Sequence, residues 1–108
     1  MEEYPERQKA LTTARAILEG TLDILNGCAR MSYEMACTDM GNDPTYDIFR
    51  GVASECDHLP IGPDRQHWNR EALLRKDEEI EKITVFYRED ILIACQDLIE
   101  RQGRPPVI

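Results

Sequence analysis

The sequence predicts an all-α protein, built as an antiparallel bundle of two long helices plus one or two short helices. Apolar residues recur at steps of three and four along most of the chain, which is the period of an amphipathic helix. No segment alternates strictly between apolar and polar residues, so no sheet is expected. The chain of 108 residues has the size of one domain. We expect residues 1–103 to form that domain and residues 104–108 to be a loose tail.

The first long helix is predicted over residues 5–37. Pro5 suits the first helical position, where its missing N–H costs nothing. Gly20 and Gly27 lie seven residues apart on one side of this helix, and each costs about 1 kcal/mol relative to alanine in a helix interior. Close approach of another helix, or a kink, would offset that cost. The expected inward face consists of Leu11, Ala14, Ile17, Leu18, Leu22, Leu25, Cys28, Ala29, Met35 and Ala36.

The middle of the chain is predicted to contain a break, a short helix and an ordered loop. Residues 38–43 have turn chemistry, and Asp43 followed by Pro44 is typical of a cap and a first helical residue. A short helix is therefore expected over residues 44–55. Residues 57–63 cannot be helical throughout, because two prolines disfavour helical angles in the residues before them.

A second long helical segment is predicted over residues 64–102, in two pieces. Asp64 or Asn69 can cap the first piece. Residues 75–79 are all charged and interrupt the apolar pattern, so we expect a bend or a solvated stretch there. Leu73 and Leu74 are expected to face inward before this stretch, and the inward face is expected to resume with Ile80, Ile83, Phe86, Tyr87, Ile91, Ala94, Cys95, Leu98 and Ile99.

The charge balance bears on the class of partner. The chain has 21 acidic and 13 basic residues, for a formal net charge of −8, and the excess is spread along the sequence. An acidic surface repels phosphate backbones, so no nucleic-acid partner is expected, whereas a basic protein would be attracted. No apolar run approaches the roughly 20 residues of a spanning helix, so no membrane association is expected. The acidic start of the chain lacks the features of a secretory signal, which predicts a cytoplasmic location.

The segment from Ser54 to Trp68 is the densest in residues that carry chemistry. Two carboxylate-x-x-histidine pairs lie within it, Glu55 with His58 and Asp64 with His67. Di-iron bundles use Glu-x-x-His on separate long helices, whereas here the two pairs are nine residues apart across a proline–glycine break. A metal or small-ligand site built from these four residues is therefore the alternative hypothesis, and no cofactor is expected.

A structural role suits the same segment better. We expect Trp68 to anchor the loop against the bundle, Asp57 to accept hydrogen bonds from backbone groups, and Arg65 to pair with Glu55 or Asp57. A nucleophile–base pair formed by the cysteine at 56 and the histidine at 58 is disfavoured, because residues two apart do not face each other on a helix.

Part of this segment resembles a small, uncharacterised family of bacterial all-helical proteins. The resemblance rests on the pattern Ser54-Glu55-x-Asp57-His58-Leu59-Pro60-x-Gly62-x-x-Arg65-x-x-Trp68-Asn69-x-x-Ala72-Leu73, with the segment 27–30 fitting the same pattern. It covers about residues 14–100 and implies no agreed activity. Small, acidic, all-helical proteins are similar to the immunity partners of bacterial toxins. This similarity is an analogy of size, charge and fold class.

The leading hypothesis is therefore a non-enzymatic, acidic protein-binding module, most concretely an immunity or antitoxin-like inhibitor of a basic toxin domain. A homodimeric scaffold is the third hypothesis. The candidate contact residues are one exposed aromatic residue and seven acidic residues, namely Tyr33, Asp39, Asp43, Asp47, Asp57, Glu78, Glu79 and Glu81.

Overall fold

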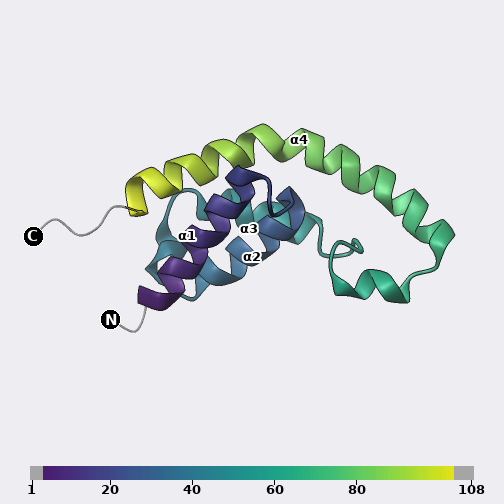
Figure 1. Cartoon of the computed structure of the whole chain (residues 1–108), viewed down its shortest axis with the longest axis horizontal. Helices are drawn as coiled ribbons and strands as arrows, with labels where there is room; N and C mark the ends of the chain where they lie inside the picture. The colour runs from purple at the N-terminus through teal and green to yellow at the C-terminus, as the bar shows by residue number, and fades with distance from the viewer. Residues whose placement is uncertain (1–3, 104–108) are drawn as a thin grey trace, which may run out of the picture.

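The computed structural model describes residues 4–103, so the predicted tail at residues 104–108 lies outside the described part. Within that part the chain is helical and has no strand, which confirms the all-α class. The elements, in order, are α1 (Tyr4–Glu19), α2 (Ile24–Ala36), the short 3₁₀ helix η1 (Asp39–Asn42), α3 (Tyr46–Glu55), the 3₁₀ helix η2 (Pro63–His67) and α4 (Arg70–Gln102). In Figure 1, α1, α2 and α3 lie together and the long α4 arches over them.

The prediction of one long helix over residues 5–37 is wrong, because the chain turns at Gly20 and forms two helices. Gly20 has a φ of 80°, a left-handed conformation that favours glycine. The amides of Gly20 and Thr21 close the end of α1 by bonding to Ile17 and Ala16 carbonyls at 3.2 and 3.0 Å. The Asp23 side chain then caps α2 by accepting from the Asn26 amide. The bundle therefore has one long helix, α4, packed against shorter ones.

The short middle helix begins two residues later than predicted. α3 starts at Tyr46, and the residues before it form a tight turn in which the Tyr46 amide bonds to the Asp43 carbonyl at 3.0 Å. The Asp43 carboxylate accepts from the amide of Thr45 and does not cap the helix. This turn sets the direction in which α3 leaves η1.

The second helical segment breaks at Trp68 and Asn69, and not at the charged residues 75–79. Asn69 caps α4 by accepting from the Ala72 amide at 2.8 Å, and α4 then continues without interruption for 33 residues. The charged stretch is helical and half-exposed to exposed. Figure 1 shows that the amino-terminal half of α4 extends beyond the other α-helices toward the 59–69 turn. No helix within residues 4–103 is both long and apolar enough to cross a membrane.

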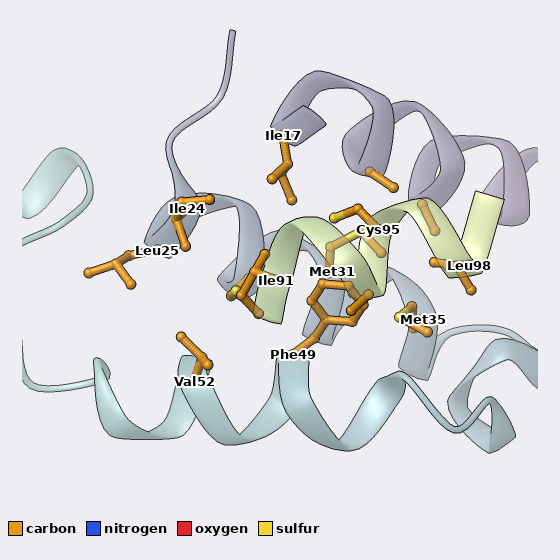
Figure 2. Close-up of a cluster of buried hydrophobic side chains, with 14 of the residues drawn as sticks. Ile17, Ile24, Leu25, Met31, Met35, Phe49, Val52, Ile91, Cys95 and Leu98 are labelled. Atoms are coloured by element: carbon orange, nitrogen blue, oxygen red, sulfur yellow. The ribbon is translucent and has the colours of Figure 1, made fainter. Parts of the chain in front are cut away.

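The core lies where all four α-helices meet. Figure 2 shows Ile17 of α1, Met31 of α2, Phe49 of α3 and Cys95 of α4 turned toward one another. The buried residues of α4 fall only in its carboxyl-terminal half, namely Ile91, Ala94, Cys95 and Leu98. The amino-terminal half of α4 is therefore held by fewer buried contacts than the rest of the fold.

Four residues predicted to face inward do not. Ala29 and Ala36 are exposed on α2, and Leu74 and Phe86 are 62% and 73% exposed on α4. The buried face of α4 continues from Ile91 back to the half-buried Tyr87 by a step of four, and this leaves Phe86 on the outer side.

Candidate functional site

The 57–69 segment is an ordered turn braced by Arg65. The Arg65 guanidinium donates to both carboxylate oxygens of Asp77 on α4, at 2.7 and 3.2 Å, and to the Pro60 carbonyl at 3.0 Å. The prediction that Arg65 pairs with Glu55 or Asp57 is therefore wrong, because its carboxylate partner is Asp77. This two-pronged contact joins the turn to the part of α4 that extends beyond the bundle.

The rest of this segment is fixed from the other side by α2. The Asn26 side-chain amide donates to the Ile61 carbonyl at 2.6 Å, and Leu59 and Pro60 are buried. Trp68, predicted to anchor the turn, is half-buried at the end of η2. Glu55 and Asp57, in contrast, are exposed. The observed bracing comes from Arg65 and from backbone contacts.

Of the four residues of the alternative metal hypothesis, the structure describes the side chains of three, and His67 is exposed at the end of η2. His58 points toward α4, where its Nε2 lies 3.7 Å from an oxygen of Glu79. Glu55 lies near Tyr87 of α4 and raises the pKa of that tyrosine. The side chain of Asp64 lies outside the described part. Among the side chains that are described, no three of His, Cys, Asp or Glu are placed so that they could hold a metal ion.

The four cysteines differ in their surroundings. Cys28, Cys56 and Cys95 are buried, and Cys37 is exposed. Burial raises the thiol pKa to about 12 for Cys28 and Cys95 and to about 11 for Cys56. Because the thiolate is the reactive form, these three thiols are suppressed as nucleophiles at neutral pH. This argues against thiol catalysis by Cys56.

We expect iodoacetamide to modify Cys37 rapidly in the folded protein and the other three cysteines only after unfolding, because they are both buried and protonated. Intact-mass spectrometry over a time course would count the modified thiols. The Cys37→Ser variant should show no rapid modification under native conditions. Rapid labelling of Cys56 in the folded protein would contradict the described burial.

A charged cluster around the buried carboxylate of Asp43 ties the turn between η1 and α3 to the end of α4. The Arg101 guanidinium contacts both oxygens of Asp43, at 2.6 and 3.0 Å, and the amide of Gln102 donates to the same carboxylate at 3.0 Å. Thr45 donates to Oδ1 of Asp43 from both its backbone amide and its hydroxyl. Burial opposes ionisation of Asp43, but the bonds from Arg101, Thr45 and Gln102 outweigh it and hold the Asp43 pKa well below its usual range. Asp43, predicted to contact a partner, is therefore a buried structural residue.

The remaining predicted contact residues lie in separate regions. Asp39 pairs with Arg7 at 2.7 Å, and Arg7 also reaches Gln102 at the carboxyl end of α4. Asp57 and Glu79 flank His58 near the other end of α4. Positions 79 and 102 are about 35 Å apart along a helix. The two groups cannot contact one small partner domain through a single compact patch.

Tyr33 is 72% exposed, as expected for a contact residue. It lines a shallow open groove of about 700 Å³ between α2 and the 61–63 turn, together with Asn26 and Arg30. Asp47, on α3, is exposed and lies 3.7 Å from Arg50. Neither residue lies on α4.

The outer surface of α4 is a feature that the sequence analysis did not identify. Four large apolar side chains are exposed there, namely Leu74, Val85, Phe86 and Ile93. Spacing alone did not reveal this surface, because Phe86 lies three residues from Ile83 and was therefore expected to face inward. Large apolar groups that gather on one exposed helix commonly mark an interaction surface.

Comparisons with protein-family models, with curated proteins and with solved structures give no significant match to this chain. The resemblance to a bacterial helical family therefore stays a prediction.

Proposed function

We propose that the protein is a non-enzymatic module that binds a basic protein partner through the exposed amino-terminal half of α4. In its most concrete form the proposal is an immunity or antitoxin-like inhibitor that covers a basic toxin domain. The main support for this proposal is an acidic strip flanked by exposed apolar residues. The strip lies where α4 extends beyond the other helices.

This acidic strip consists of Leu74, Glu78, Glu81 and Val85. The steps between them are four, three and four residues, so they lie along one side of α4. Leu74 and Val85 are 62% and 58% exposed, and both glutamates are exposed. Apolar anchors combined with charged groups are typical of protein interfaces and provide both affinity and partner selection.

The charges of this strip are available to a partner. Neither Glu78 nor Glu81 forms an ion pair with a cation among the residues that the structure describes. Nearby carboxylates are already engaged, since Asp77 binds Arg65 and Glu79 lies 3.4 Å from Lys76. Unpaired exposed carboxylates speed the approach of a basic protein and give binding that weakens with salt.

The test is a quantitative pull-down from a lysate of the native host at low salt, using the wild type and Glu78→Lys/Glu81→Lys. The double variant should fold, because both of its positions are exposed. We expect the wild type to enrich a basic protein and the charge-reversed variant to retain about tenfold less of it. The matched control, Glu19→Lys/Asp90→Lys, changes the net charge equally at exposed sites outside the strip.

The immunity hypothesis adds a second measurement on the partner that is recovered. That partner should arrest growth when it is expressed alone, and co-expression of the wild-type protein should restore growth. If no basic protein is enriched, or if the partner binds the charge-reversed variant as well as the wild type, the proposal is wrong.

A further inference from the structure

The amino-terminal half of α4 and the turn formed by residues 57–69 make up a part of the fold with few buried contacts. None of the α4 residues 70–90 is buried, whereas the buried residues that anchor α4 in the core all follow position 90. Figure 1 shows this half of α4 extending beyond the other α-helices, with the turn as its neighbour. Segments with few buried contacts can open locally while the rest of a protein stays folded.

The amino-terminal half of α4 can unwind without loss of the whole helix. Its carboxyl-terminal half keeps its core contacts, so no helical turn has to be nucleated again when the unwound part re-forms. The apolar side chains of the amino-terminal half that pack against the core, Ile80, Ile83 and Tyr87, are only half-buried. Unwinding from the Asn69 cap as far as Tyr87 therefore exposes no fully buried side chain of α4.

A bond between the turn and α4 opposes this unwinding. The Arg65 guanidinium binds both carboxylate oxygens of Asp77 and also the Pro60 carbonyl, so it joins the turn to α4 at a fixed geometry. The hydrogen bonds of this pair lower the pKa of Asp77 and raise that of Arg65. The ionic contact of His58 with Glu79 is longer, at 3.7 Å. We call the contact of Arg65 with Asp77 the clasp.

Cys56 lies beneath this part of the fold. It directly follows α3, is 1% exposed, and borders a groove together with Leu59 and Ile61 of the turn. Burial raises its thiol pKa to about 11, and the nearby carboxylates of Glu55 and of Glu79 on α4 add to this effect. The other two buried cysteines lie on α2 and on the carboxyl-terminal half of α4. Separation of the turn from α4 therefore uncovers Cys56 and leaves the other two thiols buried.

We propose that residues 57–87 form one unit that opens reversibly, and that the clasp sets how often this unit opens. In the open state α4 is unwound between Asn69 and Tyr87, the turn has separated from it, and Cys56 is accessible. The helices α1 and α2, the body of α3 and the carboxyl-terminal half of α4 stay folded.

The opening bears on the acidic strip, because Glu78 and Glu81 lie inside this unit. The strip has its helical spacing only in the closed state, so a partner that binds the strip would hold the unit closed. This effect on partner binding rests on the proposed function. The opening itself does not, since it is measured on the chain alone.

Hydrogen exchange of the full chain, followed by mass spectrometry, measures the opening. The amides of residues 76–86 exchange through the local opening, whereas the amides of residues 28–35 and 91–98, the core set, exchange only when the whole fold opens. We expect protection factors about a hundredfold lower for residues 76–86 than for the core set. Equal protection in the two sets would indicate a single cooperative unit and overturn the proposal.

Two single variants separate the clasp from the core. Arg65→Ala removes a contact that both openings break, so it should lower the protection of both sets by the same factor, about fivefold for a half-exposed ion pair. Ile17→Val removes Cδ1, which faces Gly27 between α1 and α2, and the local opening keeps that contact. It should lower the protection of the core set about fivefold and leave residues 76–86 unchanged. Loss of protection in residues 76–86 on Ile17→Val, or no loss there on Arg65→Ala, contradicts the proposal.

Arg75→Ala is the matched control for the clasp, because Arg75 is exposed on the same stretch of α4 and forms no ion pair among the described residues. It should leave the protection of both sets unchanged. Arg65→Ala/Asp77→Asn should open no more often than Arg65→Ala, since loss of the arginine already releases the carboxylate. Additive effects of the two substitutions would show that the two residues do not act as a clasp.

Thiol alkylation tests whether the same opening uncovers Cys56, in a Cys37→Ser background that removes the exposed thiol. In urea below the unfolding midpoint, iodoacetamide should modify Cys56 well before the other two buried cysteines. Arg65→Ala should raise the rate at Cys56 about fivefold, and Ile17→Val should leave it unchanged. Modification of all three buried thiols at one rate, or a rate at Cys56 that Arg65→Ala does not change, overturns the proposed opening.

Discussion

Arg101→Ala is expected to lower the free energy of unfolding by about 3 kcal/mol. The Asp43 side chain is only 1% exposed, and the guanidinium that contacts both of its oxygens is its only ionic partner among the described residues. Removal of Arg101 leaves a buried carboxylate whose charge is no longer balanced. A domain of this size has a total stability of about 5–15 kcal/mol, so urea denaturation would register the loss clearly.

The matched control is Arg50→Ala, which removes an exposed ion pair. Arg50 and Asp47 are 3.7 Å apart, and their side chains are 58% and 85% exposed. The expected change is within about 0.5 kcal/mol, because solvent screens such a pair. Arg101→Met/Asp43→Asn should be less destabilised than Arg101→Met alone, since asparagine keeps an acceptor for Thr45 without leaving a charge. Equal effects of Arg101→Ala and Arg50→Ala would refute this account.

The same cluster predicts an acid-sensitive part of the stability. The folded-state pKa of Asp43 lies below its ordinary value, so folding favours the ionised form. The contribution is fully present above the unfolded-state pKa of about 3.9, and it is lost as the pH falls through the lower folded-state pKa. The wild type should therefore lose unfolding free energy as the pH falls below about 4, and Asp43→Asn should lose less of it over the same pH range in urea denaturation.

The helical class could be predicted from the sequence, but the break at Gly20 was missed for a physical reason. The apolar positions before the break, Ile17 and Leu18, and those after it, Leu22 and Leu25, are still three or four residues apart. Periodicity alone therefore cannot detect the turn. The local chemistry could have indicated it, because a glycine followed three residues later by Asp23 is typical of a helix end and a new cap.

The contacts of the charged residues could not be predicted from local spacing. Arg65 was expected to pair within its own loop, and it instead reaches Asp77 on α4. Asp43 and Arg101 are 58 positions apart, so their pairing depends on how α3 and α4 pack. The sequence identified Arg65 as a bracing residue from the composition of its segment, but only the fold determines which carboxylate it meets.

Gly27→Val is expected to destabilise the fold by about 3 kcal/mol, at the upper end of the usual cost of overpacking. Gly27 is buried where α2 passes α1, and a Cβ added to it would lie 2.5 Å from both Cγ1 and Cδ1 of Ile17. Ile17 is itself buried and cannot swing into solvent. The side chain added at position 27 must therefore push the two helices apart.

Gly51→Val is the matched control for this substitution, because Gly51 is also helical but has no atom within 4 Å of an added Cβ. Valine and glycine have similar helix propensities, so the expected change there is within about 0.5 kcal/mol. Ile17→Ala/Gly27→Val should be less destabilised than the sum of its single variants, because truncation of Ile17 makes room for the valine. Strict additivity, or equal costs at positions 27 and 51, would show that the α1–α2 crossing tolerates a side chain at position 27. The close approach of the two helices would then not be the reason for a glycine inside α2.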